Sequence, residues 1–462
     1  MHAFSPLRQL APPLLAVLLA GCASFSDDGG FDAVNQTAQQ RLKQHTVWIR
    51  SEQDIDGVMQ RVRALLATPL SVDDAVQIAL LNNRELQASY SELGIAEADL
   101  VQAGRLPNPG FSFGRTHSGD DIKIERSLTF SVMRLLTMPA SSRIEARRFE
   151  QTKLRLVDAM LRTAVQTRKA YYQSIAATQS LRYLEQVRQA AEVAHELAAR
   201  MAKQGNFSQL DAAREQAFYL DTTAQLTRAR SQALQEQEAL MRLLGLRTQD
   251  GALQLPPRLP ALPQQAVTLA DSEQVALEQR LDVQSAKLEV AALQDSLGLS
   301  KATRFVNVLD LGYVRNSESA KAAEIGYQAS IEIPLFDWGG VRVAKANAIY
   351  MQAVHRLAAT AVQAQSEVRV AYAVQQHAYA LARQYRDEVV PLRKRIADEY
   401  LLRYNGMLAS VFELLADARE QAAAVNAAIA ATRDYWLADS DLQLALGGPV
   451  ASGHNQTERN HD

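Results

Sequence analysis

The residue types that most often carry chemistry are scattered along this chain. Its 462 residues include eight histidines, and none of them form a His-x-x-x-His or His-x-His pair that would suggest a metal site. No glycine-rich phosphate-binding loop is present. The adjacent acids Asp73 and Asp74 fit a helix cap and first-turn charge better than a catalytic pair. We therefore expect a protein that is not an enzyme and uses no cofactor or metal, so that any energy comes from a partner.

The single cysteine, Cys22, could carry a different chemistry. It follows a short apolar region, Leu10 to Ala20, and ends the sequence Leu-Leu-Ala-Gly-Cys. This ending resembles the lipobox of bacterial lipoproteins. The resemblance implies that residues 1–21 are a signal peptide, and that Cys22 is acylated on its thiol and its new amino group. Ala23 behind the cysteine, rather than Asp, favours the outer membrane by the same resemblance. A plain secretory signal with a chance cysteine is the alternative.

Composition excludes several classes of protein. A net charge of −2 gives no reason to expect a nucleic acid or another polyanion as partner. One cysteine permits neither a disulfide framework nor a thiolate metal cluster. Beyond residue 20 no apolar run reaches the roughly 18 residues that a membrane-spanning helix needs. If the chain crosses a membrane, we expect it to do so as strands.

Two very long predicted helices would position the functional residues of the chain. Residues 140–204 and 341–405 are each 65 residues long and contain no glycine. A helix of that length measures roughly 100 Å. In the first stretch, apolar and small residues recur in steps of three and four, which is typical of a coiled-coil seam. The second contains Pro391, where we expect a kink.

Each long helix is preceded by a pair of short alternating segments. They cover about 110–117 and 122–133 in the first half, and about 304–314 and 324–335 in the second. Alternation with a period of two predicts strands with one apolar and one polar face. Turn-rich residues lie between the members of each pair, so each pair predicts a β-hairpin.

The order of elements repeats at an offset of about 200 residues, which pairs Gly205 with Gly406 at the ends of the two long helices. Each copy contains a helix, a hairpin, a long helix and a shorter helix. The predicted helices besides the long ones are about 71–106, 208–244, 269–301 and 410–446. The shorter helices of one copy, stacked end to end, would match the length of its long helix. The predicted organisation is an acylated tether and helix (22–69), a first repeat (70–245), a proline-rich linker (246–268), a second repeat (269–446) and a disordered tail (447–462).

Four short motifs carry a resemblance to a known family. Residues 70–83 contain an Ala-Leu-x-Asn-Asn core, and residues 102–109, 333–340 and 403–406 add three further motifs in order. With them, the chain resembles the TolC-like outer-membrane efflux family over most of its length. The second strand exit includes Pro334, Trp338, Gly339 and Gly340. The first strand exit, 134–143, lacks the Asp-x-Gly-Gly signature of the second.

The resemblance implies a mainly α fold with a small β part and a homotrimeric assembly. Three subunits would share a 12-stranded outer-membrane β-barrel, continuous with an α-helical tunnel in the periplasm. Four strands with one apolar face cannot close alone in lipid, which independently requires other copies. The implied function is the exit channel of a tripartite export system, a passive conduit served by a periplasmic adaptor and an inner-membrane pump.

Two features are candidate functional sites, the first of them implied by the family. The turns Gln204-Gly205-Asn206 and Tyr404-Asn405-Gly406 would dock the adaptor, although simple helix punctuation is the alternative. Asp398 and Glu399 would repeat threefold in a trimer, as carboxylate rings that select cations do. A solvated helix face is the alternative for these two residues.

Two other functions remain open from sequence. A periplasmic adaptor lipoprotein would need one helical hairpin flanked by β-rich domains, and a structural coiled-coil lipoprotein would need no alternating strands. The cargo, whether drug, metal ion or peptide, is not specified because the pump selects it.

Overall fold

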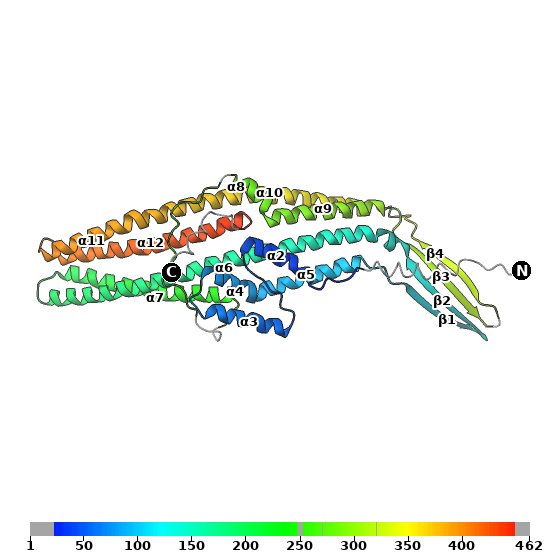
Figure 1. Cartoon of the computed structure of the whole chain (residues 1–462), viewed down its shortest axis with the longest axis horizontal. Coiled ribbons are helices and arrows are strands. Elements are labelled where there is room, and N and C mark those ends of the chain that lie inside the picture. Colours follow the sequence, from blue (N-terminus) through cyan, green and yellow to red (C-terminus); the bar gives the residue numbers. More distant parts are fainter. Residues whose placement is uncertain (1–22, 248–252, 270, 320, 449–462) are drawn as a thin grey trace. The chain divides into compact units, whose positions relative to one another are not determined.

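The computed structural model describes residues 23–247, 253–269, 271–319 and 321–448 (Figure 1). The chain forms two compact units. Unit 1 contains the described residues through Val34, with Tyr90–Leu156 and Leu281–Ala361. Unit 2 contains the described residues of Asn35–Ser89, of Val157–Arg280 and from Val362 to residue 448. The predicted signal peptide, Cys22 and all but two residues of the predicted tail lie outside the described residues.

Helices make up most of both units. None of those in the described ranges has the length and apolar character needed to cross a membrane. They are α2 (Phe31–Leu42), α3 (Glu52–Leu66), α4 (Val72–Asn82), α5 (Arg84–Ala103), α6 (Val132–Lys203), α7 (Gln209–Leu243), α8 (Ser272–Gln279), α9 (Leu281–Ala302), α10 (Gly340–Gln384), a π-helical segment η3 (Tyr385–Val389), α11 (Val390–Asn405) and α12 (Val411–Ala445).

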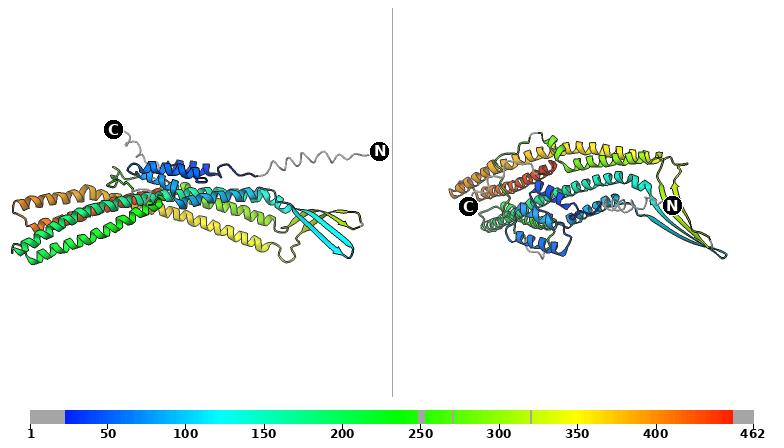
Figure 2. Two further views of the ribbon diagram at one scale, coloured as in Figure 1. Left: turned by 90° about the horizontal axis from the view of Figure 1, so that it is seen from below. Right: turned by 45° about the vertical axis from the view of Figure 1, so that its right-hand side comes forward.

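Unit 1 contains one antiparallel four-stranded sheet in the order β1-β2-β3-β4 (Figure 1). Figure 2 shows the first hairpin in cyan and the second in yellow. The strands are β1 (Gly110–Ser118), β2 (Asp121–Ser131), β3 (Leu309–Glu318) and β4 (Glu324–Ile331). Both predicted hairpins are confirmed, and β2 and β3 join them. β3 lies further along the chain than predicted, at Leu309–Glu318 rather than 304–314, whereas β4 begins at Glu324 as predicted. β4 ends earlier than predicted because Pro334 has no N–H to continue the ladder.

The first long helix begins earlier than the sequence indicates. α6 starts at Val132, directly after β2, and contains Pro139 in its interior. The prediction that Pro139 marks the helix start, and that the strand reaches residue 133, was wrong. A proline removes only one helical hydrogen bond, and the helix continues on both sides of that gap. α6 therefore has 72 residues.

The second long helix is irregular just before its proline. The Val390 N–H donates to the Tyr385 carbonyl, five residues back, which defines the π turn. Pro391 follows as one of the first residues of α11. The irregularity expected at Pro391 thus takes the form of a wide turn that accommodates the missing N–H.

Two helices predicted as continuous are broken where another helix ends. Asn83 separates α4 from α5, and Arg280 separates α8 from α9, both with extended backbone. At Asn83 the end of α7 packs so closely that a Cβ on Gly245 would lie 2.3 Å from the Asn82 carbonyl oxygen. At Arg280 a Cβ on Gly447, after α12, would lie 2.8 Å from the carbonyl oxygen of the preceding residue. We call these two places the first and second helix junctions.

The Asn-Asn pair of the sequence motif has a clear structural role at the first junction. The Asn82 side-chain amide donates to the carbonyls of Leu244 and Gly245, at 3.0 and 2.9 Å. Asn83 donates to the Leu243 carbonyl at 2.9 Å. These bonds satisfy helix-end carbonyls that have no intrahelical donor.

The second junction uses an arginine from the N-terminal segment. Arg41 donates to the carbonyls of Gln279 and Gly447, at 2.8 and 2.5 Å. Burial lowers the pKa of this guanidinium from its ordinary value. Both junctions therefore provide side-chain donors for backbone carbonyls at helix ends. The donors are asparagine amides at the first junction and an arginine at the second.

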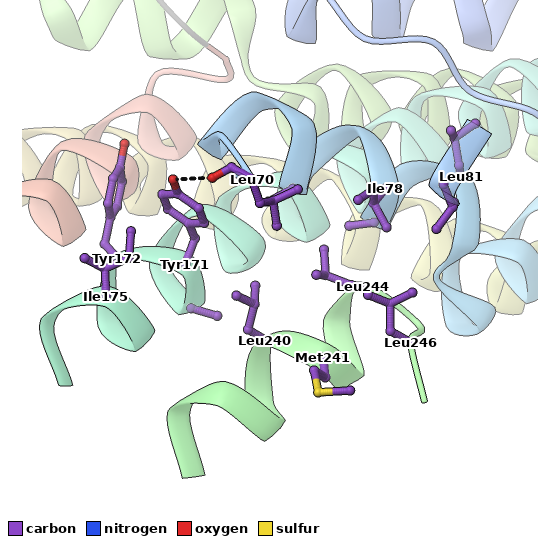
Figure 3. Packing of buried hydrophobic residues seen from close by; sticks show 14 of the residues in the cluster. Leu70, Ile78, Leu81, Tyr171, Tyr172, Ile175, Leu240, Met241, Leu244 and Leu246 are labelled. Atoms are coloured by element: carbon purple, nitrogen blue, oxygen red, sulfur yellow. Dashed lines mark hydrogen bonds between the residues drawn. The ribbon is translucent and has the colours of Figure 1, made fainter. Parts of the chain in front are cut away.

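The core of unit 2 lies around α4, α6 and the end of α7 (Figure 3). The Tyr171 hydroxyl donates to the Leu70 carbonyl at 2.8 Å, which ties α6 to the start of α4. The cluster consists of Val58, Val62, Leu70, Ala75, Ile78, Ala79, Leu81, Ala170, Tyr171, Tyr172, Ile175, Leu240, Met241, Leu244 and Leu246.

Burial raises the pKa of Tyr171 to about 12, from an ordinary value of 10.0. A raised pKa means that the neutral phenol is favoured by folding, so this stabilisation is complete below pH 10 and disappears as the pH rises through about 12. We expect roughly 2 kcal/mol of stability to be lost over that window. Phenolate absorbance of wild type minus that of Tyr171→Phe should show this midpoint; titration near pH 10 in the folded protein would contradict it.

The predicted tether and linker are packed rather than extended. In unit 1, Ser26 donates from its backbone N–H and its hydroxyl to the buried carboxylate of Glu97, at 2.7 and 2.5 Å. In unit 2, the Tyr379 hydroxyl donates to the carbonyl of Pro263 and the Trp436 indole donates to that of Pro260. The first bonds hold the N-terminal segment, and the others hold the proline-rich linker.

Candidate functional site

The predicted tip residues occupy two tight turns of unit 2. In the first, Gly205 has φ +75° and lies between α6 and α7. The Asn206 N–H donates to the Met201 carbonyl, and the Gly205 N–H to that of Ala202. This pair of bonds is a Schellman motif, in which the left-handed position favours glycine. We call residues 204–208 the first tip.

The second turn has the same hydrogen bonds but a different residue in the left-handed position. The Leu408 N–H donates to the Arg403 carbonyl at 2.7 Å, and the Met407 N–H to that of Tyr404 at 3.0 Å. Met407 has φ +59°, whereas Gly406 has φ −82°. The prediction that Gly406 matches Gly205 was therefore wrong by one residue, and Met407 is its counterpart. We call residues 404–410 the second tip.

Met407 and Leu408 project into solvent. Their exposed fractions are 93% and 82%, and Tyr404 is exposed to 39%. A left-handed backbone costs a non-glycine residue roughly 1–2 kcal/mol, and exposed apolar side chains add no packing to offset it. Both features fit a surface selected for contact with another molecule.

Both tips are followed by well-capped helices. Ser208 accepts a hydrogen bond from the Asp211 N–H, and Ser410 accepts one from the Glu413 N–H. At the second tip the Glu413 carboxylate also accepts from the Ser410 N–H, which lowers the pKa of Glu413. The sequence analysis placed helix starts near both serines and is confirmed there.

The two candidate pore acids differ in their surroundings. Glu399 accepts a hydrogen bond from Arg403 at 2.9 Å, and this pairing raises the pKa of the guanidinium. Asp398 is exposed and has no ion pair with any residue that the structure describes. Only Asp398 is thus left with an uncompensated charge. Across the described ranges, no cluster of three or more His, Cys, Asp and Glu side chains could hold a metal.

Sequence reasoning missed a buried ion pair between α7 and α12. Arg419 bonds to Glu215 at 2.5 Å, and the Glu215 side chain is only 1% exposed. The guanidinium also lies 4.4 Å from the centre of the Phe218 ring. The pair links the helix after the first tip to the helix after the second. No local pattern could have revealed it, since the two residues are 204 positions apart.

The strand-exit residues lie in unit 1 and have a structural role. Gly339 has φ +73°, and a Cβ there would lie 2.4 Å from the Arg304 carbonyl oxygen. Its N–H donates to Asp337, while Arg304 donates to the Trp338 carbonyl. These contacts form the turn that carries the chain from β4 into α10. Gly340 is the first residue of α10, and Pro334 lies just after β4.

Comparison with known proteins gives a clear result for the fold. No protein-family model and no curated protein sequence matches the chain. The CmeC outer membrane channel of Campylobacter jejuni superposes with a TM-score of 0.72, at 18% identity over 82% of this chain and 85% of that one. The chain has an outer-membrane channel fold.

Two further structures support the same fold. The open-state MtrE outer membrane channel of Neisseria gonorrhoeae has a TM-score of 0.67 and 19% identity, covering 84% of this chain and 89% of its own. VceC, an outer membrane protein of Vibrio cholerae, has a TM-score of 0.67 and 17% identity, covering 82% and 96%. The resemblance to TolC-like outer-membrane channels, with a mainly helical fold and a small antiparallel sheet, is therefore confirmed. A channel fold also agrees with the prediction that the chain is not an enzyme.

Proposed function

We propose that this chain is the outer-membrane exit channel of a tripartite export system. Three copies would form a 12-stranded barrel from their four-stranded sheets and a periplasmic tunnel from their long helices. An adaptor would dock at the tips, an inner-membrane pump would supply the energy, and the channel would conduct passively. Acylation at Cys22 would anchor each copy to the outer membrane.

The uncovered sheet is the observation that carries this proposal. One of its faces is apolar and exposed: Phe111 is exposed to 69%, Tyr327 to 91% and Ile331 to 55%. β1 and β4 are edge strands with unpaired backbone groups. An apolar face needs lipid, and open edges need partner strands, so a closed barrel of several copies satisfies both requirements.

The experiment that tests this function uses the full chain purified in mild detergent. We expect a trimer mass after the detergent contribution is subtracted, heat-modifiable electrophoretic migration, and conductance in planar bilayers. A monomer that shifts no mobility on heating and opens no conductance would refute the channel. Loss of metabolic palmitate labelling in Cys22→Ser would test the anchor separately.

The adaptor alternative is less well supported. It requires β-rich domains beside one helical hairpin, whereas the described residues contain one four-stranded sheet and helices. A structural coiled-coil lipoprotein would leave the exposed apolar sheet without a role. Trimer mass and conductance separate both from the channel.

Adaptor docking is expected to depend on the second tip. Met407→Asp with Leu408→Asp should remove the apolar projection and reduce adaptor cross-linking and export at least tenfold, since desolvated apolar anchors dominate interfaces. Asp can adopt the left-handed backbone, so the trimer should persist. Leu234→Asp, which changes an exposed leucine of α7 (61%) far from both tips, is the control. Undiminished cross-linking in the double variant would contradict docking there.

Cation selectivity is expected to depend on Asp398 rather than Glu399. Asp398→Asn should lower the cation preference of single channels, because three uncompensated carboxylates are removed from the trimer. Glu399→Gln should change it less, since Arg403 already balances that charge. Unchanged selectivity in Asp398→Asn would favour the solvated-face interpretation.

A further inference from the structure

The sheet separates its charged residues by face. Alternation places the apolar residues on the same face as Arg115, Arg126 and Arg315, which we call the arginine cluster. Within the four described strands, that face carries no Asp or Glu. The charged residues of the opposite face are Asp121, Lys123, Glu125, Asp310, Glu318 and Glu324.

The strand register brings the three arginines together. Arg126 of β2 lies directly opposite Arg315 of β3. Arg115 of β1 pairs with Ile124, so it is a diagonal neighbour of Arg126. Directly opposed residues have Cβ atoms about 5 Å apart, and diagonal neighbours are about 7–8 Å apart. Like charges at these positions repel, which destabilises the sheet unless an anion lies between them.

Among the residues that the structure describes, no acidic side chain supplies that anion. None of the three guanidinium groups has an ion pair or side-chain hydrogen bond to another residue that the structure describes. The acids at the same level, Glu125 and Glu324, belong to the opposite face. The cluster therefore has three unbalanced positive charges at the surface.

Apolar side chains border the cluster. The row that contains Arg126 and Arg315 ends in Phe113 on β1 and Ile325 on β4, which are exposed to 58% and 63%. The next row towards the helices is apolar or aromatic throughout, and it consists of Phe111, Leu128, Tyr313 and Tyr327. A complementary ligand needs an anionic head for the arginines and hydrocarbon for these rows.

We propose that the arginine cluster binds the phosphate monoesters of a phosphorylated glycolipid in the outer leaflet, with its acyl chains along the apolar rows. The inference rests on the proposed channel function, in which this face meets lipid. Guanidinium groups match phosphate oxygens with paired hydrogen bonds. A phosphate monoester carries a charge of about −1.5 to −2 at pH 7, so two of them supply at least the roughly three negative charges that balance three arginines. A free phosphate would leave the apolar rows unused.

The experiment measures binding of diphosphoryl lipid A to the full-chain trimer in detergent by native mass spectrometry. The same lipid with both phosphates removed is the comparison ligand. We expect wild type to prefer the diphosphoryl lipid at least tenfold, and Arg126→Gln with Arg315→Gln to lose that preference. Lys123→Gln, on the opposite face of β2, is the matched control and should keep it. Equal binding of both lipids by wild type overturns the proposal without any variant.

The remaining outcomes also decide the question. Equal preference in the double variant and wild type, with the trimer intact in both, would overturn the arginine site. Equal binding of phosphatidylglycerol would show a generic anionic-lipid surface and overturn the monoester claim. A trimer that conducts but shows no lipid preference refutes this inference alone, whereas a chain that neither trimerises nor conducts refutes the channel and this inference with it. If the glutamine pair does not assemble, Arg126→Lys with Arg315→Lys retains charge and should weaken the preference severalfold.

Discussion

Gly245→Ala is expected to destabilise the chain by about 2–4 kcal/mol. The residue has φ +66°, which costs any side chain about 1 kcal/mol or more. Its new Cβ would lie 2.3 Å from the Asn82 carbonyl oxygen, a backbone atom that cannot rotate away. The end of α7 must therefore move off the first helix junction, an overpacking that typically costs 1–3 kcal/mol.

Gly205→Ala is the matched control for this prediction. Gly205 has φ +75°, nearly the same backbone, but a Cβ there would meet nothing within 4 Å. It should therefore lower stability by only about 1 kcal/mol. Melting of the full chain in detergent, followed by circular dichroism, would measure both. Equal shifts would mean that the close approach at Asn82 does not matter.

Arg419→Ala is expected to cost about 3 kcal/mol. It leaves the carboxylate of Glu215 buried without its partner, and breaking a buried pair on one side typically costs 3–5 kcal/mol. The lower end applies because the Arg419 side chain is 26% exposed and water can partly replace it. The cation–π contact with Phe218 is lost as well.

Two further variants test whether the cost comes from the unpaired buried charge. Arg393 forms an exposed pair with Glu420 of α12 at 3.0 Å, so Arg393→Ala should cost less than 1 kcal/mol. Glu215→Leu with Arg419→Met removes both buried charges and should recover most of the loss. If the double variant melts as low as Arg419→Ala, the cost comes from lost packing rather than from an unpaired charge.

The comparison between sequence and structure is clearest at the tips and the junctions. The sequence analysis found both tips because glycine interrupts two very long helical stretches. It paired Gly406 rather than Met407 with Gly205 because each glycine closes a 65-residue stretch without glycine. Gly245 and Gly447 are 202 residues apart, as are Gly205 and Met407. The offset of 202 residues therefore identifies Met407 as the counterpart of Gly205. It can be measured only after the structure has shown that Gly245 and Gly447 occupy equivalent junctions.

The sequence by itself determined the type and order of the elements and the apolar face of the sheet. Those properties follow from periodicity, and a period of two or of three to four residues is set by local backbone geometry. The tertiary structure alone decided the breaks at Asn83 and Arg280, the pairing of Glu215 with Arg419 and the meeting of Arg126 with Arg315. Each depends on residues more than 150 positions apart, and local propensity contains no information about which distant backbone or charge will lie opposite.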